Sequence, residues 1–329
     1  MRICVFGAGA IGSLIGARLA ASGVDVSLVA RGEHLDAIRE RGLVLLEGDQ
    51  KITARPRATD DPASLGPQDH VIVALKANSV PDAVDAMAPL LAARTTVVTA
   101  QNGIPWWFFH AFTGSFEGHR IESVDPGGRV WDQLGPHRAI GCVVYPSCEV
   151  IEPGVVRHLD GERLMVGEPD GSVTPRVQEI AAALHAAGFR APVRRRIRDD
   201  VWLKLWGNVS FNPVSALTMA TVAEIGAHAP SIAVVRTMME ESAAVARALG
   251  ARFPVDVETR IEWALGAGEH KTSMLQDLER GRPMEIGALI GAVAELGRLV
   301  AVTTPTIDVV LGLLELRERT GYSPPPTLR

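Results

Sequence analysis

Residues 1–31 read MRICVFGAGAIGSLIGARLAASGVDVSLVAR and predict a strand, a glycine turn, a helix and a second strand. Arg2–Phe6 has the length and apolar character of a buried strand, and apolar residues at helical spacing follow the glycines. The turn Gly7-Ala8-Gly9-Ala10-Ile11-Gly12 has the spacing of a dinucleotide-binding loop. Its first glycine makes the turn, its second admits a pyrophosphate and its third lets the helix pack on the strand. Free N–H groups at the helix start favour the diphosphate.

The composition indicates a globular chain of two domains. Its 329 residues exceed one compact α/β unit, and 47% hydrophobic with 22% charged residues is ordinary. A net charge of −5 disfavours nucleic acid and anionic membranes as partners. Cys4, Cys142 and Cys148 lack metal-ligand spacing, so we expect no metal and a reducing, cytoplasmic compartment. We also expect neither a signal peptide nor a membrane span, because the longest uncharged stretch, 205–223, contains asparagines and a proline.

The end of the second predicted strand bears on the choice of cofactor. This strand covers Val24–Ala30 and is followed by Arg31. A site for NAD usually has a carboxylate near this point, whereas an arginine suits the 2′-phosphate of NADP. Asp25 stands at the strand's start, too early for that role. We therefore predict NADP; the alternative is an exposed arginine that only flanks a loop.

Two further predicted strands deliver polar residues to one edge of the sheet. Val71–Leu75 ends directly before Lys76, and Thr96–Ala100 ends shortly before Asn102. Ligands of doubly wound sheets bind outside the carboxyl ends of the strands. The pair Asn102-Gly103 alone would indicate only a turn. Together with Lys76 and the glycine turn, it indicates a binding site.

The alternation of strands and helices ends near residue 197. Strand-like patterns cover 139–150, 154–159 and 163–167, a helix covers Thr174–Gly188, and a last strand covers Arg190–Arg194. We predict a Rossmann-type doubly wound α/β domain at 1–196 and an all-α domain at 197–329. Other expected elements of the first domain are helices at 34–41 and 80–93 and a hairpin at 42–54.

Residues 104–137 form an unusually long connection. The run PWWFFH at 105–110 precedes a stretch rich in glycine and proline. Long loops inside compact domains are uncommon and often functional. The aromatic run fits neither a helical nor a strand period. This favours a lid over the site or a subunit contact, with core as the alternative.

The second domain contains a lysine and two asparagines on one helix face. Lys204, Asn208 and Asn212 recur every four residues, so the row drifts only ~40° per step. The opposite face is apolar, and Pro213 is expected to kink or end the helix. A partly buried lysine can donate a proton to a developing alkoxide. The alternative, a surface lysine with incidental asparagines, remains equally open on this segment alone.

A third polar group follows near the C-terminus. Ser273 and Asp277 are one helical turn apart, Gly281 is typical of a helix end, and Pro283 is expected to begin the next helix with Glu285 near its start. Helix-end electrostatics is the simpler alternative for both acidic residues. We expect the last helices, 286–299 and 305–317, to be buried and the tail 323–326 to be disordered.

As a set, these motifs resemble the 2-dehydropantoate 2-reductases (ketopantoate reductases) along nearly the whole chain. Their order and spacing are more specific than any one motif. The motifs are Gly7-x-Gly9-x-x-Gly12, Arg31, Leu75-Lys76-Ala77, Gln101-Asn102-Gly103, Lys204-Leu-x-x-Asn208-x-x-x-Asn212-Pro213, Ser273-Met-Leu-Gln-Asp277 and Glu285-Ile286.

The resemblance implies an NADP-dependent oxidoreductase that acts on CH–OH groups and reduces 2-dehydropantoate to pantoate for pantothenate and coenzyme A synthesis. Lys204 would be the general acid that protonates the C2 carbonyl oxygen, and Glu285 would bond the substrate hydroxyl and this lysine. Ser273 would hold the substrate carboxylate, while the two asparagines of the helix would orient lysine and substrate. The implied substrate contacts are Asn102, Asn208, Asn212, Ser273 and Asp277.

The resemblance also implies how NADPH would bind. The loop of Gly7, Ala8, Gly9, Ala10, Ile11 and Gly12 would hold the diphosphate. Arg31 and Lys76 would take the 2′-phosphate, and Asn102 would lie near the nicotinamide ribose or the substrate. Hydride donor and proton donor then come from different domains, which places the expected reaction in the cleft between them.

Two departures from the family pattern leave alternatives open. Residues 104–137 are longer and more aromatic than usual, and Gly287 and Ile290 replace residues that are often Asp and Asn. Both changes could alter the shape of the substrate site, so another branched or bulky 2-oxo acid is the alternative substrate. A non-catalytic NADP-binding sensor is a further alternative, and a homodimer is compatible with the apolar terminal helices.

Overall fold

The computed structural model describes residues 1–266 and 268–321 and divides into two compact units. Unit 1 comprises Met1–Arg120 and Asp125–Asp200, and unit 2 comprises Ile121–Val124 and Val201–Arg329. The division after Asp200 lies later than the predicted boundary after residue 196, because one helix runs through it. The segment 121–124 belongs to unit 2, although the sequence predicted it within the first domain.

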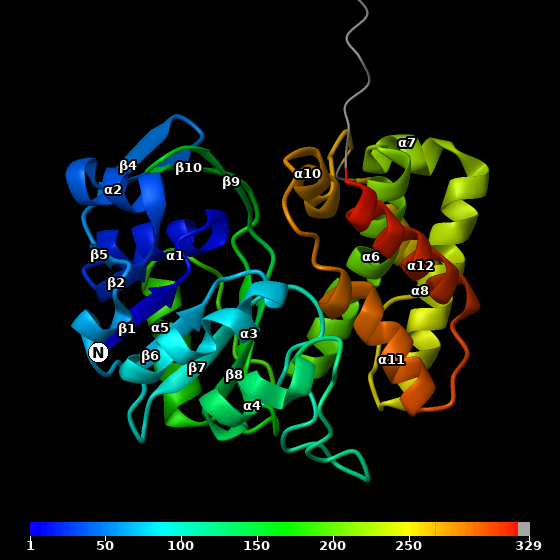
Figure 1. Ribbon diagram of the computed structural model, residues 1–329, viewed down its shortest axis with the longest axis horizontal. Coiled ribbons are helices and arrows are strands. Elements are labelled where there is room, and N and C mark those ends of the chain that lie inside the picture. Colours follow the sequence, from blue (N-terminus) through cyan, green and yellow to red (C-terminus); the bar gives the residue numbers. More distant parts are fainter. Residues whose placement is uncertain (267, 322–329) are drawn as a thin grey trace, which may run out of the picture. The chain divides into compact units, whose positions relative to one another are not determined.

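Unit 1 is built on a seven-stranded sheet of order β11-β8-β7-β6-β1-β2-β5. Six neighbouring strands, among them β6, β7 and β8, are parallel (Figure 1). The last strand, β11, pairs with β8 antiparallel. The central strands are almost continuously apolar because both faces of a parallel sheet are covered. The strands are β1 (Arg2–Phe6), β2 (Asp25–Val29), β5 (Arg57–Thr59), β6 (His70–Val73), β7 (Thr96–Ala100), β8 (Ala139–Val144) and β11 (Leu164–Gly167).

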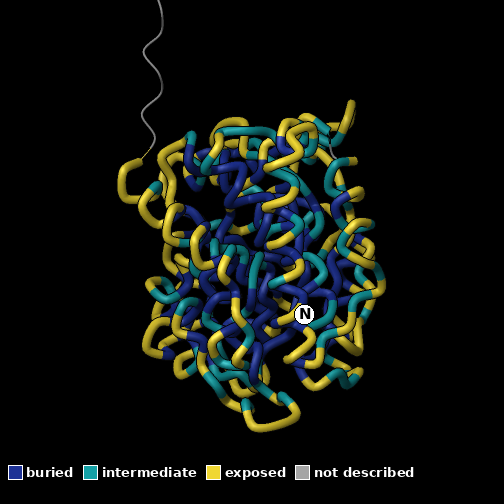
Figure 2. Tube along the Cα trace, turned by 90° about the vertical axis from the view of Figure 1, so that its right-hand side faces the viewer, coloured by how far each residue is buried: buried dark blue, intermediate teal, exposed yellow. Residues whose placement is uncertain are grey.

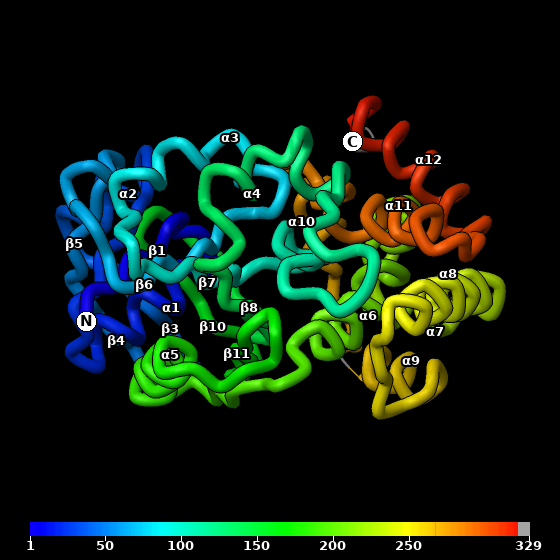
Figure 3. The backbone as a smooth tube through the Cα atoms, turned by 90° about the horizontal axis from the view of Figure 1, so that it is seen from below, coloured from blue at the N-terminus to red at the C-terminus, as the bar shows by residue number. Residues whose placement is uncertain are grey.

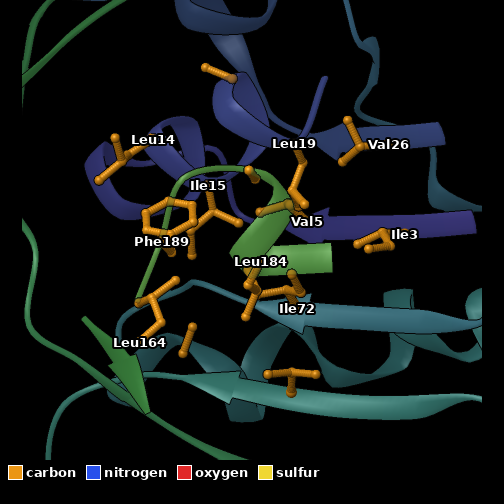
Figure 4. Packing of buried hydrophobic residues seen from close by; sticks show 14 of the residues in the cluster. Ile3, Val5, Leu14, Ile15, Leu19, Val26, Ile72, Leu164, Leu184 and Phe189 are labelled. Carbon is orange, nitrogen blue, oxygen red and sulfur yellow. The ribbon is translucent and has the colours of Figure 1, made fainter. Parts of the chain in front are cut away.

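Helices complete this Rossmann-like domain and place its core against the sheet. Leu14 and Ile15 of α1 and Leu184 of α5 are almost fully buried beside strand residues such as Val5 (Figure 4). In Figure 2, exposed residues lie mainly at the outer turns of the trace. The α-helices are α1 (Ala10–Ala21), α2 (Gly32–Arg41), α3 (Val80–Ala83), α4 (Arg129–Leu134) and α5 (Pro175–Ala186). The 3-10 segments are η1 (Pro62–Leu65), η2 (Ala77–Ser79), η3 (Val84–Leu90), η4 (Pro126–Gly128) and η5 (Pro136–Arg138).

A second, four-stranded sheet has the order β4-β3-β10-β9 and contacts α1. The hairpin predicted at 42–54 is confirmed as β3 and β4, which pair antiparallel. The strand-like pattern at 139–150 divides between β8 in the large sheet and β9 in the small one, and β9 pairs antiparallel with β10, which covers the pattern at 154–159. The strands are β3 (Leu43–Glu47), β4 (Gln50–Ala54), β9 (Ser147–Glu152) and β10 (Val155–Asp160).

Two predicted elements of unit 1 are wrong, and prolines explain both. The helix predicted at 80–93 is a single α-turn followed by a 3-10 segment that contains Pro89 and ends at Leu90. The strand predicted at Arg190–Arg194 forms only isolated bridges to Arg163 and Val166. Pro192 lacks an N–H group and cannot complete a ladder there.

The aromatic run at 105–110 is part of the core of unit 1, so the interpretation as a lid or subunit contact is wrong. Trp106, Trp107, Phe108 and Phe109 are at most 4% exposed. The indole of Trp107 donates a hydrogen bond to Thr99 of β7 at 2.9 Å. An irregular backbone can bury aromatic rings without any regular period, which is why periodicity did not identify them as core.

Unit 2 is helical, and α8, α11 and α12 contact one another (Figure 3). Pro213 lies inside α6 without ending it. None of the helices among the described residues is long and apolar enough to cross a membrane. The helices are α6 (Ile197–Thr218), α7 (Val222–Ala227), α8 (Ala229–Ala248), α9 (Val257–Leu265), α10 (Ser273–Glu279), a π turn η6 (Gly287–Gly291), α11 (Ala292–Leu299) and α12 (Pro305–Thr320).

The two terminal helices differ from the expected buried packing. Most of α11 is buried, but α12 exposes Val309, Leu313 and Leu316, which are between 52% and 64% exposed. Pro283 lies ahead of the helical stretch that begins at Ile286, so it does not form the first turn as predicted. The tail predicted to be disordered at 323–326 lies outside the described residues.

Candidate functional site

The glycine turn after β1 can be made only by glycine at its first position. Gly7 has a φ of 102°, which L side chains rarely adopt, and a Cβ there would stand 2.6 Å from Cδ2 of Leu75. The N–H groups of Gly7 and Ala8 donate hydrogen bonds to the carbonyl oxygen of Val29 at 3.1 and 3.0 Å. The turn is therefore fixed between β1 and the neighbouring strand β2.

The other two glycines differ in what surrounds them. A Cβ on Gly12 would stand 1.9 Å from the carbonyl oxygen of Gly7, so this position requires close backbone packing. A Cβ on Gly9 would meet nothing within 4 Å, and Gly9 precedes α1 without a side-chain cap. Open space beside uncapped N–H groups at the start of a twelve-residue helix suits a phosphate group.

The predicted cofactor residues follow the carboxyl ends of four adjacent parallel strands, β7, β6, β1 and β2. Asn102 follows β7, Lys76 follows β6 and Arg31 follows β2, while the glycine turn follows β1. Arg31 is exposed, whereas Lys76 and Asn102 are half-buried. Asp25 is the first residue of β2 and thus lies at the strand's opposite end. The structure brings these predicted residues to one edge of the sheet.

A partly buried hydrogen-bonded relay supports the turn, and no pattern in the sequence predicted it. The hydroxyl of Ser13 donates to the carbonyl oxygen of Ala8 at 3.0 Å and lies 3.1 Å from Nε2 of His34. Nδ1 of His34 accepts a hydrogen bond from the N–H of Gly154 at 3.0 Å. The proton of the neutral ring is therefore on Nε2, which donates a hydrogen bond to the hydroxyl of Ser13. Burial lowers the pKa of His34, which favours this neutral form. No spacing rule connects Ser13 with His34.

In unit 2 the predicted face of α6 is present. Lys204 and Asn208 are half-buried, and Asn212 is 6% exposed. The opposite face is anchored by Trp206, whose indole donates to the carbonyl oxygen of Met239 at 2.6 Å. The other residues predicted for packing, Val201, Leu205 and Val209, are buried. This helix therefore holds the lysine and the two asparagines together on a face that is not fully solvated.

Arg260 of α9 lies beside this helix and was not predicted. Its Nε donates to the carbonyl oxygen of Leu203 at 3.3 Å. A Cβ on Gly207 would stand 2.2 Å from its Nη2, so the missing side chain makes room for the guanidinium. The guanidinium of Arg260 therefore lies against α6 at the helical turn between Lys204 and Asn208. The only sequence signal was a glycine inside a helix.

The remaining predicted residues lie on and after α10. Ser273 is the exposed first residue of this helix, and Thr272 caps it by accepting the N–H of Leu275 at 3.2 Å. Asp277 is 5% exposed, and its carboxylate pairs with Arg282 at 2.9 Å. Glu285 is 9% exposed and directly precedes the helical stretch that contains the π turn.

Chemically, unit 1 offers a glycine turn suited to a phosphate group, with Lys76 and Arg31 following neighbouring strands, and unit 2 offers a lysine, two amides and a buried glutamate. Among the described residues, no group of three or more His, Cys, Asp or Glu side chains could hold a metal ion.

Comparison with known proteins agrees with this arrangement. The family described as "Ketopantoate reductase PanE/ApbA" matches residues 3–171, and "Ketopantoate reductase PanE/ApbA C terminal" matches residues 196–318. A 2-dehydropantoate 2-reductase of Mesorhizobium japonicum is 54% identical over 95% of this chain and 97% of its own length.

Solved structures show the same fold over the full length. A candidate ketopantoate reductase from Ralstonia solanacearum is 42% identical, with a TM-score of 0.92 over 97% of this chain and 98% of that one. A 2-dehydropantoate 2-reductase from Geobacter metallireducens is 31% identical, with a TM-score of 0.84 over 96% of this chain and 99% of that one. This chain belongs to the ketopantoate reductase family, whose members are oxidoreductases that act on CH–OH groups.

Proposed function

We propose that this chain uses NADPH to reduce the C2 carbonyl of 2-dehydropantoate to the 2-hydroxyl of pantoate, a step toward pantothenate and coenzyme A. The supporting observation is the face of α6, where Lys204 stands in one row with Asn208 and Asn212. A relative at 54% identity carries the name of this activity, and the match covers nearly all of both chains.

The residues of unit 1 fit NADPH. The open space at Gly9 and the uncapped start of α1 suit the diphosphate, and the loop from Gly7 to Gly12 encloses it. Arg31 and Lys76 supply positive charge for the 2′-phosphate, and Asn102 bonds the nicotinamide ribose or the substrate. When bound, NADPH supplies the hydride that adds to C2.

The residues of unit 2 supply the proton and hold the substrate. Nζ of Lys204 protonates the carbonyl oxygen as charge develops there, so the carbonyl becomes the alcohol. The amides of Asn208 and Asn212 orient the lysine and the substrate, Ser273 binds the carboxylate and Glu285 binds the hydroxyl and Lys204. Asp277 belongs to this site through its pair with Arg282, which fixes the chain between Ser273 and Glu285. General-acid help of this kind contributes about 10²–10⁴-fold in rate.

The experiment that tests this function removes the proton donor. Lys204→Ala should lower kcat for 2-dehydropantoate by at least about 10²-fold, the low end for general-acid catalysis. NADPH binding, measured by fluorescence titration, should be retained because unit 1 is unchanged. Lys51→Ala, on the exposed strand β4, is the control and should keep wild-type turnover. Undiminished turnover of Lys204→Ala would contradict the assignment of the general acid.

Another branched or bulky 2-oxo acid is the second candidate substrate. The observation that favours it concerns Gly287, one of the two departures from the family pattern. The carbonyl oxygen of Ser123 occupies the space that a side chain at this position would take. Steady-state kinetics on a small panel of 2-oxo acids separates the two. We expect the highest kcat/KM for 2-dehydropantoate, and a higher value for another member of the panel would support the alternative.

We also propose a homodimer in the cytoplasm. The exposed apolar residues of α12 give this helix a face that a second copy of the chain can cover. Burial raises the pKa of the Cys4 and Cys148 thiols to about 12. Thiols that stay protonated suit a reducing compartment.

A further inference from the structure

The segment Ile121–Val124 leaves the long connection of unit 1 and docks within unit 2. We call it the strap. Ile121 is 1% exposed and Val124 is 8% exposed, so both of its apolar side chains are buried. Such burial of a short irregular segment needs partners for its backbone groups.

Glu295 of α11 supplies those partners. Its two carboxylate oxygens accept the N–H groups of Glu122 and Ser123, each at 2.8 Å. One side chain thus satisfies two consecutive backbone donors, and both hydrogen bonds are charge-assisted. The recognition is of the backbone, because the buried hydroxyl of Ser123 has no hydrogen-bond partner among the residues that the structure describes.

Two glycines of the helical stretch after Glu285 lie against the strap. A Cβ on Gly287 would stand 2.2 Å from the carbonyl oxygen of Ser123, so any side chain at this position would displace the strap. A Cβ on Gly291 would make only ordinary contact, 3.6 Å from the Cβ of Ser123 and 3.4 Å from the carbonyl oxygen of Ile286.

The π turn aligns these positions with Glu295. Four residues of an α-helix overshoot one full turn by about 40°, so positions 287, 291 and 295 would spiral away from a straight segment. In this turn the N–H of Ala292 bonds the carbonyl oxygen of Gly287, five residues back, which widens the helix and offsets that drift. The strap therefore contacts the helix along one line from Gly287 to Glu295.

We propose that the strap is a positioning element for Glu285. The carbonyl group of Ser123 fills the space beside Gly287, which lies two residues after Glu285. The N–H groups of Glu122 and Ser123 donate hydrogen bonds to the carboxylate of Glu295. Displacing the strap would release the π turn and misplace the carboxylate that binds the substrate hydroxyl. Gly287 and Glu295 are thus positioning residues, and this inference rests on the role proposed above for Glu285.

The test adds a methyl group at either of two glycines, Gly287 or Gly291. Gly287→Ala would clash with the carbonyl oxygen of Ser123 in the strap, whereas Gly291→Ala would make only ordinary contact with Ser123 and is the matched control. We expect Gly287→Ala to raise KM for 2-dehydropantoate roughly tenfold or more, the scale of a lost hydrogen bond to a charged group, with the Kd of NADPH unchanged. Gly291→Ala should stay within about twofold of wild type, because its Cβ would make only ordinary van der Waals contacts and would neither overpack the core nor displace the strap. Equal KM values for the two variants would overturn the proposal.

A substrate analogue distinguishes positioning from a general loss of stability. With hydrogen in place of the substrate's hydroxyl group, the KM effect of Gly287→Ala should largely disappear, because the analogue makes no bond to Glu285. A variant that is merely less stable would be impaired equally toward both compounds, which would contradict a positioning role. Glu295→Gln keeps the size of the side chain but turns one acceptor into a donor, so it should show the same substrate-dependent pattern. Ser123→Ala should match wild type.

Hydrogen exchange tests the strap without relying on turnover. The amides of Glu122 and Ser123 should be protected in wild type and Gly291→Ala and should exchange faster in Gly287→Ala and Glu295→Gln. Equal exchange in all four proteins would overturn the docking of the strap. If wild type does not reduce 2-dehydropantoate but these amides respond as expected, the proposed function fails while the docking stands.

Discussion

Arg31 stands two residues after β2, where the side chain that meets the ribose of a bound dinucleotide is usually found. It is exposed and precedes α2 without capping it by a side-chain hydrogen bond. This position suits a side chain that supplies positive charge to a 2′-phosphate better than one that stabilises the fold.

Arg31→Asp should reverse the preference between the two nicotinamide cofactors. We expect KM for NADPH to rise about tenfold or more, since a charge-assisted hydrogen bond contributes about 1.5–3 kcal/mol. KM for NADH should fall, because an aspartate can accept the ribose 2′-OH. Aspartate is also a good N-cap for α2, so the folded state should not be weakened. Arg55→Ala, an exposed arginine of unit 1, is the control, and an unchanged NADPH/NADH ratio in Arg31→Asp would remove Arg31 from the site.

His34 gives the turn a dependence on pH. Burial lowers the pKa of His34 below its ordinary 6.5. The unfolded chain then binds this proton more tightly than the folded one, so the contribution of neutral His34 to stability is complete above about pH 6.5 and is lost as the pH falls through the folded pKa. Gln can keep an acceptor for Gly154 and a donor for Ser13 but does not titrate.

His34→Gln should therefore flatten the loss of unfolding free energy between pH 7 and pH 5, measured by urea titration at each pH. His70, His110 and His137, whose pKa values burial also lowers, remain in both proteins, so the difference between the two curves isolates His34. Parallel curves would show that His34 does not titrate in this range.

At the scale of elements, helix glycines have opposite roles in the two units. Gly16 of α1 faces Leu28 of β2, where a Cβ would stand 2.3 Å from the buried Cδ2. Gly312 of α12 is exposed and a Cβ there would meet nothing within 4 Å. The first glycine permits close packing of a helix on a sheet, and the second only weakens its helix.

The same substitution should therefore change stability in opposite directions. Gly16→Ala should cost about 1–3 kcal/mol, because Leu28 is fully buried and the core must distort to admit a methyl group. Gly312→Ala should add about 0.5–1 kcal/mol, the difference in helix propensity. Denaturant midpoints of both variants against wild type check this. A neutral Gly16→Ala would mean that α1 can move away from β2 without cost.

Local patterns in the sequence were sufficient to predict the elements that we propose to bind the cofactor. The spacing of the glycines and the apolar run before them predicted β1, the turn and α1, and the strand ends predicted where Lys76 and Asn102 lie. Periodicity could not find the strap or the relay from Ser13 to His34, because both depend on contacts between residues far apart in the chain. The departure noted at Gly287 now has a physical reason, since the carbonyl of Ser123 fills its space.

At the scale of the whole molecule, α12 exposes three large apolar side chains that a second copy of the chain can cover. Val309, Leu313 and Leu316 recur at intervals of four and three residues, so they lie on one helix face, and each is more than half exposed. A second copy that covers this face would remove it from water through a contact related by two-fold symmetry.

Leu313→Glu should convert the proposed dimer to a monomer. It places a charge at the centre of the face, and burying an unpaired carboxylate costs more than the apolar contact contributes. Light scattering after size exclusion should give twice the chain mass for wild type and the chain mass for Leu313→Glu. Leu159→Glu is the matched control, because Leu159 of β10 is 51% exposed, close to the 52% of Leu313, but lies in unit 1; it should keep the wild-type mass. A wild-type monomer would show that the face of α12 needs no second copy, and a dimer that survives Leu313→Glu would place the contact on another surface.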